Sequence, residues 1–258
     1  MSRAAPPELP PETPEEEPSS KYMTLVEHLE ELRFRLFVSA VGVVAGLAVS
    51  AYFAGDLIEF LKEPAEARNP DFQLQFIDPF EMFVSYFRVA LLGGLIFGMP
   101  VIVYQALRFV SPGLETSERR WAYLTVLGAT LLFVAGVAFA YYVALPPALG
   151  FLLNFGGDLA QPNIRVGSYI DFVTRLLFWT GVSFETPLVV MFLGRFRIVS
   201  PGQLLRWWRL AVVIAFVIAA IVTPTIDPVT QSLVAGPIIA LYFLGIVLAW
   251  LVRPRRSA

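Results

Sequence analysis

Six long apolar segments constrain the fold of this chain more than any other feature. Five carry no charged residue and the sixth carries only Glu185; each is 17 to 25 residues long, and together they make up nearly half of the 258 residues. A helix of about 20 apolar residues crosses the roughly 30 Å hydrocarbon core of a bilayer. Because polar and apolar residues do not alternate in these segments, we predict α-helices, which satisfy every backbone polar group inside lipid.

The sequence therefore predicts an all-α polytopic membrane protein. Fourteen of the 19 lysines and arginines fall on the side that also holds the N-terminus, so the positive-inside rule places both termini in the cytoplasm. We expect a membrane domain over residues 22–252, between an acidic, Pro-rich, disordered tail at 1–21 and a basic tail at 253–258. The six predicted transmembrane helices lie at about 36–55, 83–107, 120–145, 169–194, 208–226 and 228–252.

Composition excludes several classes of function. Hydrophobic residues make up 57% of the chain and charged residues only 16%, which is unlike a soluble enzyme or a disordered protein. There is no cysteine and a single histidine, His28, so disulfides, thiolate metal sites and histidine metal triads are excluded. No phosphate-binding P-loop motif is present. We therefore expect no cofactor, no metal, no nucleic-acid partner and no catalytic site.

Glu185 is the one charged residue within the apolar segments, about nine residues from the start of its run. A carboxylate at that depth costs at least about 2.5 kcal/mol on insertion scales, and such groups face a bundle interior or a wet cavity. We expect Glu185 to be functional. Gln105, near the inner end of the second predicted span, is a weaker polar candidate.

An amphipathic segment precedes the first span. Leu25, Leu29, Leu32 and Leu36 form one apolar stripe at helical spacing, so we expect a helix at the inner surface that runs into the span. The spacing also predicts ion pairs between Glu31 and Arg35 and between Glu30 and Arg33. By themselves such pairs are exposed helix contacts worth a few tenths of a kcal/mol.

The loop between the second and third spans contains the turn sequence Ser111-Pro112-Gly113. Glu118 follows just before the third span, where the helix dipole favours a carboxylate. Arg119 and Arg120 come next and fit inner-side membrane anchors. From spacing alone, structural roles account for these three residues, and a functional role stays open.

Two outer segments are distinctive. Residues 56–88 form the largest one; we expect a short helix over 56–63 and a cap over the outer ends of the spans. The hairpin between the last two spans is very short, and the fifth span has only 17 uncharged residues, about 26 Å of helix. A span this short favours local thinning of the bilayer, and Gln231 beside the hairpin is available to hydrogen-bond another helix.

Six motifs in register with the six spans resemble the TatC family of the twin-arginine translocase. They cover residues 22 to about 252, and no motif position departs from the family pattern. The matching stretches are His28-Leu-Glu-Glu-Leu-Arg-Phe-Arg35, Asp78-Pro-Phe-Glu-Met-Phe83, Pro100-Val-Ile-Val-Tyr-Gln105, Phe109-Val-Ser-Pro-Gly-Leu114 with Glu118-Arg-Arg120, Phe184-Glu-Thr-Pro187 and Thr223-Pro-Thr-Ile-Asp-Pro-Val-Thr-Gln231.

The resemblance implies a concave, glove-like bundle with a periplasmic cap in the bacterial plasma (inner) membrane. It implies a receptor for twin-arginine signal peptides on folded precursors, which nucleates a complex driven by the proton-motive force. TatA and TatB, single-span proteins, are the implied partners, together with membrane lipid and further copies of this chain. The implied site residues are Glu31, Glu118, Leu32, Arg33 and Arg119 for the signal; Glu185 and Gln105 in the membrane; Thr223, Asp227 and Gln231 for partner docking; and Pro79, Glu81 and Phe83 in the cap.

Two other functions remain open from the residues alone. A proton-coupled transporter would use Glu185 as a relay, although the chain has no evident internal repeat and no second embedded acid. A glutamate-dependent intramembrane protease would need a second catalytic group, and no serine, histidine or aspartate lies at matching depth.

Overall fold

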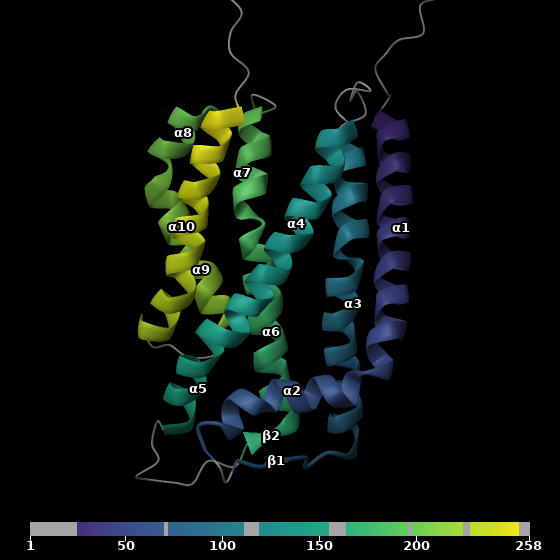
Figure 1. Ribbon diagram of the computed structural model, residues 1–258, viewed down its shortest axis with the longest axis vertical. Helices are drawn as coiled ribbons and strands as arrows, with labels where there is room; N and C mark the ends of the chain where they lie inside the picture. Colours follow the sequence, from purple (N-terminus) through teal and green to yellow (C-terminus); the bar gives the residue numbers. More distant parts are fainter. Residues whose placement is uncertain are drawn as a thin grey trace, which may run out of the picture.

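A computed structural model describes residues 25–69, 72–110, 119–154, 164–195, 198–223 and 228–252 (Figure 1). Both predicted tails lie outside this range. Across the described residues the chain forms helices and one small sheet. The elements are α1 (Leu25–Tyr52), α2 (Ala54–Glu66), β1 (Leu74–Gln75), α3 (Pro79–Val110), α4 (Arg119–Phe139), the π-helix η2 (Ala140–Ala144), α5 (Leu145–Asn154), β2 (Ile164–Arg165), α6 (Val166–Phe184), α7 (Thr186–Arg195), α8 (Pro201–Arg206), α9 (Trp208–Val222) and α10 (Pro228–Val252).

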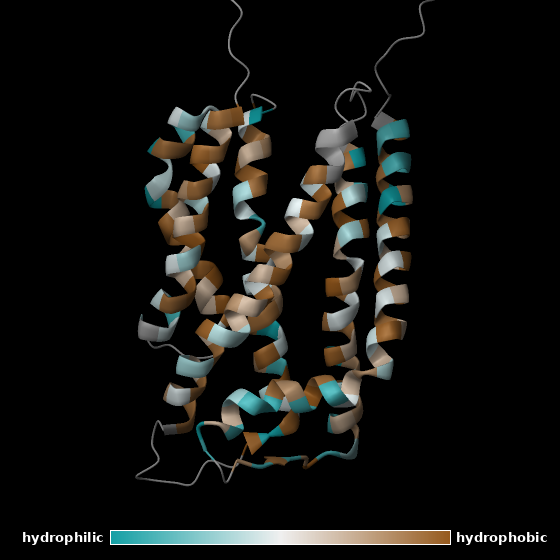
Figure 2. Ribbon diagram, viewed as in Figure 1, coloured by the Kyte–Doolittle hydropathy of each residue, from teal (hydrophilic) through white to brown (hydrophobic). Residues whose placement is uncertain are grey.

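The predicted fold class is confirmed. Among the described residues, five helical stretches are long and apolar enough to cross a membrane, and the shorter apolar helix α9 accompanies them. At 15 residues, α9 is about 22 Å long, so the fifth span is short, as the sequence predicts. The helices are apolar along most of their length (Figure 2). Many of their large apolar side chains are exposed, a surface that suits lipid and not water.

The amphipathic segment at the N-terminal end of α1 is continuous with the first span. α1 runs as one helix from Leu25 to Tyr52 and packs along α3 (Figure 1). The segment is therefore the inner end of the span itself and not a separate surface helix. We name the end of the molecule that carries Glu31 the inner end and the end that carries α2 the outer end.

Glycine allows α1 and α3 to approach closely. A Cβ atom built on Gly94 of α3 would lie 2.8 Å from the backbone nitrogen of Leu47 on α1. Contacts of this kind between small residues are the usual means of packing helices in a membrane. Because α1 contributes few buried side chains elsewhere, this contact fixes its place in the fold.

The helices form two groups that α6 connects. α1, α3 and α4 contact one another in chain order, and α7, α8 and α9 contact α10, whereas α6 contacts members of both groups. Figure 1 shows the groups on opposite sides of the molecule near the inner end. The first helix begins and the last helix ends at this same end.

Two of the predicted spans are interrupted helices. The third changes from α4 to the π-turn η2 just before Pro146 and Pro147, whose missing N–H groups remove two helical hydrogen bonds. The fourth breaks between α6 and α7 at Glu185, two residues before Pro187. The backbone N–H of Glu185 donates to Val182 in a tight i−3 turn, at 3.1 Å.

The predicted short helix of the outer segment is confirmed as α2, and it lies across the outer ends of the spans (Figure 1). It buries Ile58, Leu61 and Ala65. The Tyr141 hydroxyl donates to the Phe60 carbonyl at 2.7 Å and the Tyr169 hydroxyl to the Leu61 carbonyl at 2.6 Å. These two bonds tie the cap to the third and fourth spans.

The sheet in the outer segment was not predicted. β1 and β2 pair in parallel, with Leu74 opposite Ile164 and Gln75 opposite Arg165. The alternation of Phe72, Leu74 and Phe76 carries a strand signal. Two-residue strands joined across so much of the chain, however, have no local pattern that identifies their partner.

Candidate functional site

At the inner end, a polar network joins α1 to α3. Arg35 donates to one oxygen of Glu31, Oε1, from Nη2 at 2.8 Å and from Nε at 3.3 Å. Its Nη1 donates to the Oε1 atom of Gln105 at 3.1 Å. The predicted Glu31–Arg35 ion pair is thus confirmed. Gln105 also belongs to this network, a connection that the sequence did not predict.

The Glu31–Arg35 pair is largely shielded from solvent. The Glu31 side chain is 14% exposed and the Arg35 side chain 16%. The second carboxylate oxygen of Glu31, Oε2, is buried and has no hydrogen-bond partner. A buried acceptor left unpaired is costly, so this oxygen favours any cation or N–H donor that reaches it.

An aromatic contact holds the same end of α1. The ring of His28 stacks on that of Phe109 on α3, with centroids 4.4 Å apart. Phe109 belongs to a motif that the sequence singled out, but its pairing with His28 was not predicted. The stack and the Arg35–Gln105 bond together fix the inner end of α1 against α3.

The residues beside Glu31 are more accessible. Leu32 is half-buried, whereas Glu30 and Arg33 are both exposed and form no ion pair with each other. The predicted Glu30–Arg33 pair is therefore wrong, because an exposed ion pair gains too little free energy to hold two solvated side chains together. Glu118 lies outside the described residues. Arg119 is the first residue of α4, and its side chain also lies outside them.

Glu185 lies where α6 ends and α7 begins. The residue is half-buried, and its Oε1 atom is buried without a hydrogen-bond partner. Thr180, in the last turns of α6, also has a buried hydroxyl without a partner. Ser183 satisfies its hydroxyl by donating to the Trp179 carbonyl at 2.7 Å. The helix break thus leaves two unpaired polar groups within one span.

At the outer end, Glu81 binds the loop and the sheet together. Its Oε1 accepts from the Gly167 N–H at 2.9 Å, and its Oε2 accepts from the Ile77 N–H at 3.1 Å and from Arg165 at 3.4 Å. The Glu81 side chain is only 8% exposed. The other predicted cap residues, Pro79 and Phe83, are exposed on the first turns of α3.

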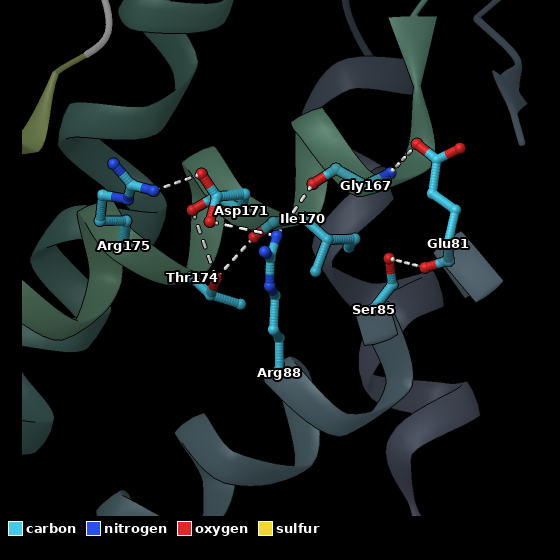
Figure 3. A network of polar contacts seen from close by, with 8 residues as sticks. All are labelled: Glu81, Ser85, Arg88, Gly167, Ile170, Asp171, Thr174 and Arg175. Carbon is cyan, nitrogen blue, oxygen red and sulfur yellow. Dashed lines mark hydrogen bonds and ion pairs between the residues drawn. The ribbon is translucent and has the colours of Figure 1, made fainter. Parts of the chain in front are cut away.

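A second outer network escaped the sequence reasoning (Figure 3). Asp171 on α6 pairs with Arg175 one turn later, at 2.6 Å, and with Arg88 on α3, at 3.1 Å. Arg88 also donates to the Gly167 carbonyl at 3.4 Å. The four-residue spacing of Asp171 and Arg175 is a sequence signal for their ion pair. The pair with Arg88 has no such signal, because it forms only where α3 packs against α6.

The three predicted docking residues lie around the α9–α10 connection. Thr223 ends α9; it is buried, and its hydroxyl donates to the Ala219 carbonyl at 2.8 Å. Gln231 is half-buried in the first turn of α10. Asp227 lies outside the described residues. Within the described part of the chain, no group of three or more His, Cys, Asp or Glu residues is placed to hold a metal ion.

Comparisons with known proteins identify the family. The family profile described as "Sec-independent protein translocase protein (TatC)" matches residues 27–237. The Aquifex aeolicus TatC protein is 39% identical over 91% of this chain and 98% of its own length. The Synechocystis TatC protein is 41% identical over 87% of each.

Plant relatives and a solved structure point to the same family. The chloroplastic TATC of Arabidopsis thaliana is 44% identical over 90% of this chain, and that of Pisum sativum 39%. The chain spans about two thirds of the length of these two relatives, 67% and 65%. A crystal structure titled as the twin arginine translocase receptor TatC superposes with a TM-score of 0.78 at 39% identity, covering 88% of this chain and 99% of that one.

These matches favour neither the proton-coupled transporter nor the intramembrane protease that the residues alone left open. The matching family and relatives are protein-translocase components. The apolar helices and the bacterial relatives make this chain a multi-pass membrane protein. The chain therefore belongs to the TatC family of Sec-independent protein translocase subunits.

Proposed function

We propose that this chain is the core receptor of a twin-arginine export system. At the cytoplasmic face, Glu31 and Glu118 bind the two arginines of a signal peptide carried by a folded precursor. Leu32, Arg33 and Arg119 line the same site. Binding nucleates assembly of a translocation complex driven by the proton-motive force, and membrane domain 22–252 forms the receptor between two cytoplasmic tails.

The observation that carries this proposal is the environment of Glu31. Its carboxylate already binds one guanidinium group, that of Arg35, through Oε1. Its second oxygen is unpaired. A carboxylate binds a guanidinium fork in a geometry that an ammonium group does not reproduce. Because Arg35 already occupies Oε1, a signal arginine binds Oε2 first and completes the fork by displacing Arg35, an exchange between guanidinium groups that favours arginine over lysine.

The embedded polar groups have a second role in the proposal. After the arginines dock, the apolar stretch of the signal lies along the membrane face near Glu185. Gln105 supports the docking site from α3 through Arg35. The short α9 helps to thin the bilayer when further subunits gather.

The proposed partners are TatA- and TatB-type single-span proteins. They dock near Thr223, Asp227 and Gln231, where the half-buried amide of Gln231 is positioned for a hydrogen bond between helices. Further copies of this chain and membrane lipid complete the receptor complex, which we place in the bacterial plasma membrane.

Site-specific photocrosslinking tests the proposal. A photocrosslinker placed in the precursor, beside the two arginines of its signal, should capture this chain, and one at the exposed position 232, next to Gln231, should capture a single-span partner. Glu31→Ala and Glu118→Ala should each weaken precursor crosslinking about tenfold or more, since each removes a charge-assisted bond worth about 1.5–3 kcal/mol. Membrane insertion of the variants should be unchanged.

Glu30→Ala is the matched control, because Glu30 is the neighbouring acid on the same helix and is exposed. It should leave crosslinking at the wild-type level. Replacing the two signal arginines by lysines should reproduce the loss seen with Glu31→Ala. If precursor crosslinking stays unchanged in both glutamate variants, the receptor assignment is wrong.

A further inference from the structure

An apolar cavity of about 380 Å³ lies at the outer end of the molecule, away from the proposed signal site. Its walls come from three helices: Leu149, Leu152 and Leu153 of α5, Phe172 of α6, and Ile221 and Val222 of α9. Ser168, Asp171 and Arg175 of α6 supply its polar side. The cavity thus combines a hydrocarbon-like interior with one charged edge.

The cavity lies where α9 ends. α9 stops at Val222 after 15 residues, whereas the stretch that contains α6 and α7 spans 30 residues. A short helix next to a long one leaves apolar side chains of the longer neighbour uncovered near one membrane surface. The volume falls in the range of about 300–1,000 Å³ found for small-molecule sites.

The charged edge has an excess of positive charge. Asp171 and Arg175 line the cavity, and Asp171 is shared between Arg175 and Arg88, which lies behind the lining. These three side chains therefore carry two positive charges and one negative charge. The Arg175 side chain is 52% exposed, so its guanidinium remains accessible to an anion while it contacts Asp171.

Arg175 also lies at the outer boundary of the uncharged part of its span. It is the last charged residue before the apolar run that begins at Leu176, and long basic side chains at the ends of spans extend toward the phosphate level. Arginine binds phosphate oxygens bidentately. The positive edge and the apolar interior are thus arranged in the order of a phospholipid headgroup and its acyl chain.

We propose that this cavity binds an acyl chain of an anionic phospholipid in the outer leaflet, with Arg175 binding the lipid phosphate. Ser168 is the neutral donor on the same edge. The cavity volume suits a lipid chain better than a partner helix. A helix about 10 Å across would fill the cavity with only about one turn. The proposal does not depend on signal-peptide binding.

The test is lipid binding by the full chain, measured by native mass spectrometry in detergent with dioleoylphosphatidylglycerol and dioleoylphosphatidylcholine. The wild-type chain should retain phosphatidylglycerol in preference to phosphatidylcholine. Arg175→Gln should weaken phosphatidylglycerol binding about tenfold, or about 1.4 kcal/mol. Asp171→Asn should strengthen it, because both arginines lose a competing carboxylate. Misfolding cannot produce that gain.

Two matched controls isolate charge and volume. Lys62→Gln removes an outer-side positive charge that pairs with Glu66 and should leave binding unchanged. Leu152→Trp fills the cavity and should lower retention, whereas Leu127→Trp, at a similarly exposed position on α4 outside the cavity, should not. Thermal melting of each variant separates loss of the lipid from loss of the fold.

Three results would overturn the proposal. The first is equal retention of phosphatidylglycerol by the wild-type chain and Arg175→Gln. The second is displacement of phosphatidylglycerol by glycerol 1-phosphate as readily as by a second phospholipid, which would make the site a phosphate site. The third is crosslinking from position 152 to a single-span protein with no lipid retained, which would make it a protein interface.

Discussion

At the scale of single residues, some polar side chains of this protein have all their hydrogen-bond partners and others keep an atom without one. Glu81 accepts three hydrogen bonds, whereas Glu31 and Glu185 each keep one buried oxygen without a partner. Unpaired buried acceptors cost stability and are retained where a ligand or a conformational step uses them. Both unsatisfied glutamates are among the residues that the sequence singled out.

Glu81→Gln should destabilise the outer cap. The amide replaces one acceptor oxygen by a donor, so one of the backbone N–H groups of Ile77 and Gly167 loses its partner, and the ion pair with Arg165 is lost. The expected cost is about 1–3 kcal/mol, seen as a lower melting temperature in detergent. Glu66→Gln is the control; it alters an exposed pair with Lys62 and should shift melting little.

Glu185→Gln should keep signal docking but reduce transport. The substitution preserves the size of the side chain and removes only its ability to ionise at the break between α6 and α7. The proposed signal site, at the inner end of α1 and α3, therefore stays intact. Crosslinking from the precursor signal to this chain and export of a reporter precursor measure the two effects separately. Wild-type export by this variant would argue for a purely structural Glu185.

At the scale of elements, close helix contacts fix which surfaces meet. The α1–α3 contact depends on Gly94, which has no room for a Cβ atom beside Leu47. Gly94→Leu should separate the helices and cost about 1–3 kcal/mol or more, as expected for overpacking. It should also weaken the Arg35–Gln105 bond and therefore precursor crosslinking.

Gly128→Leu is the matched control for this prediction. Gly128 lies on α4, and a Cβ atom there would meet no other atom within 4 Å. The variant should melt and crosslink like the wild type. If both leucine variants behaved alike, the loss would stem from hydrophobicity or expression and not from helix packing.

Prediction of the elements from sequence was most successful where the signal is local. The span at 228–252 coincides with α10, because apolar content over 20 or more contiguous residues identifies a membrane helix. The pairing of β1 with β2 was not predicted, because its deciding contacts lie in a distant segment. The interruption of the third span by η2 was not predicted either, although the neighbouring Pro146 and Pro147 are a local signal for it.

At the scale of the whole molecule, the topology predicted from the sequence polarises the charge across the membrane. On that topology, the net charge of −2 combines a positive inner side with a negative outer side. Glu31 and Glu118 are then among the few acids on a basic side of the chain. The proposed signal arginines would find few other carboxylates there to bind.

The absence of cysteine from the sequence makes the orientation directly testable. Single substitutions Glu30→Cys and Glu66→Cys place a thiol at exposed positions of the inner and outer ends. In intact cells a membrane-impermeant maleimide should label position 66, and it should label position 30 only after permeabilisation. The reverse pattern would invert the proposed cytoplasmic location of the signal site.

The sequence by itself determined the properties that depend on contiguous residues: the membrane helices, the short α9, the α2 helix, the Glu31–Arg35 pair and the motifs of the family. The tertiary structure decided which distant residues meet. It joined Arg35 to Gln105, Glu81 to Gly167 and Arg88 to Asp171, and it formed the outer cavity. Helical periodicity fixes the face on which a side chain lies, but the relative register of two packed helices fixes its partner, and that register follows only from the whole fold.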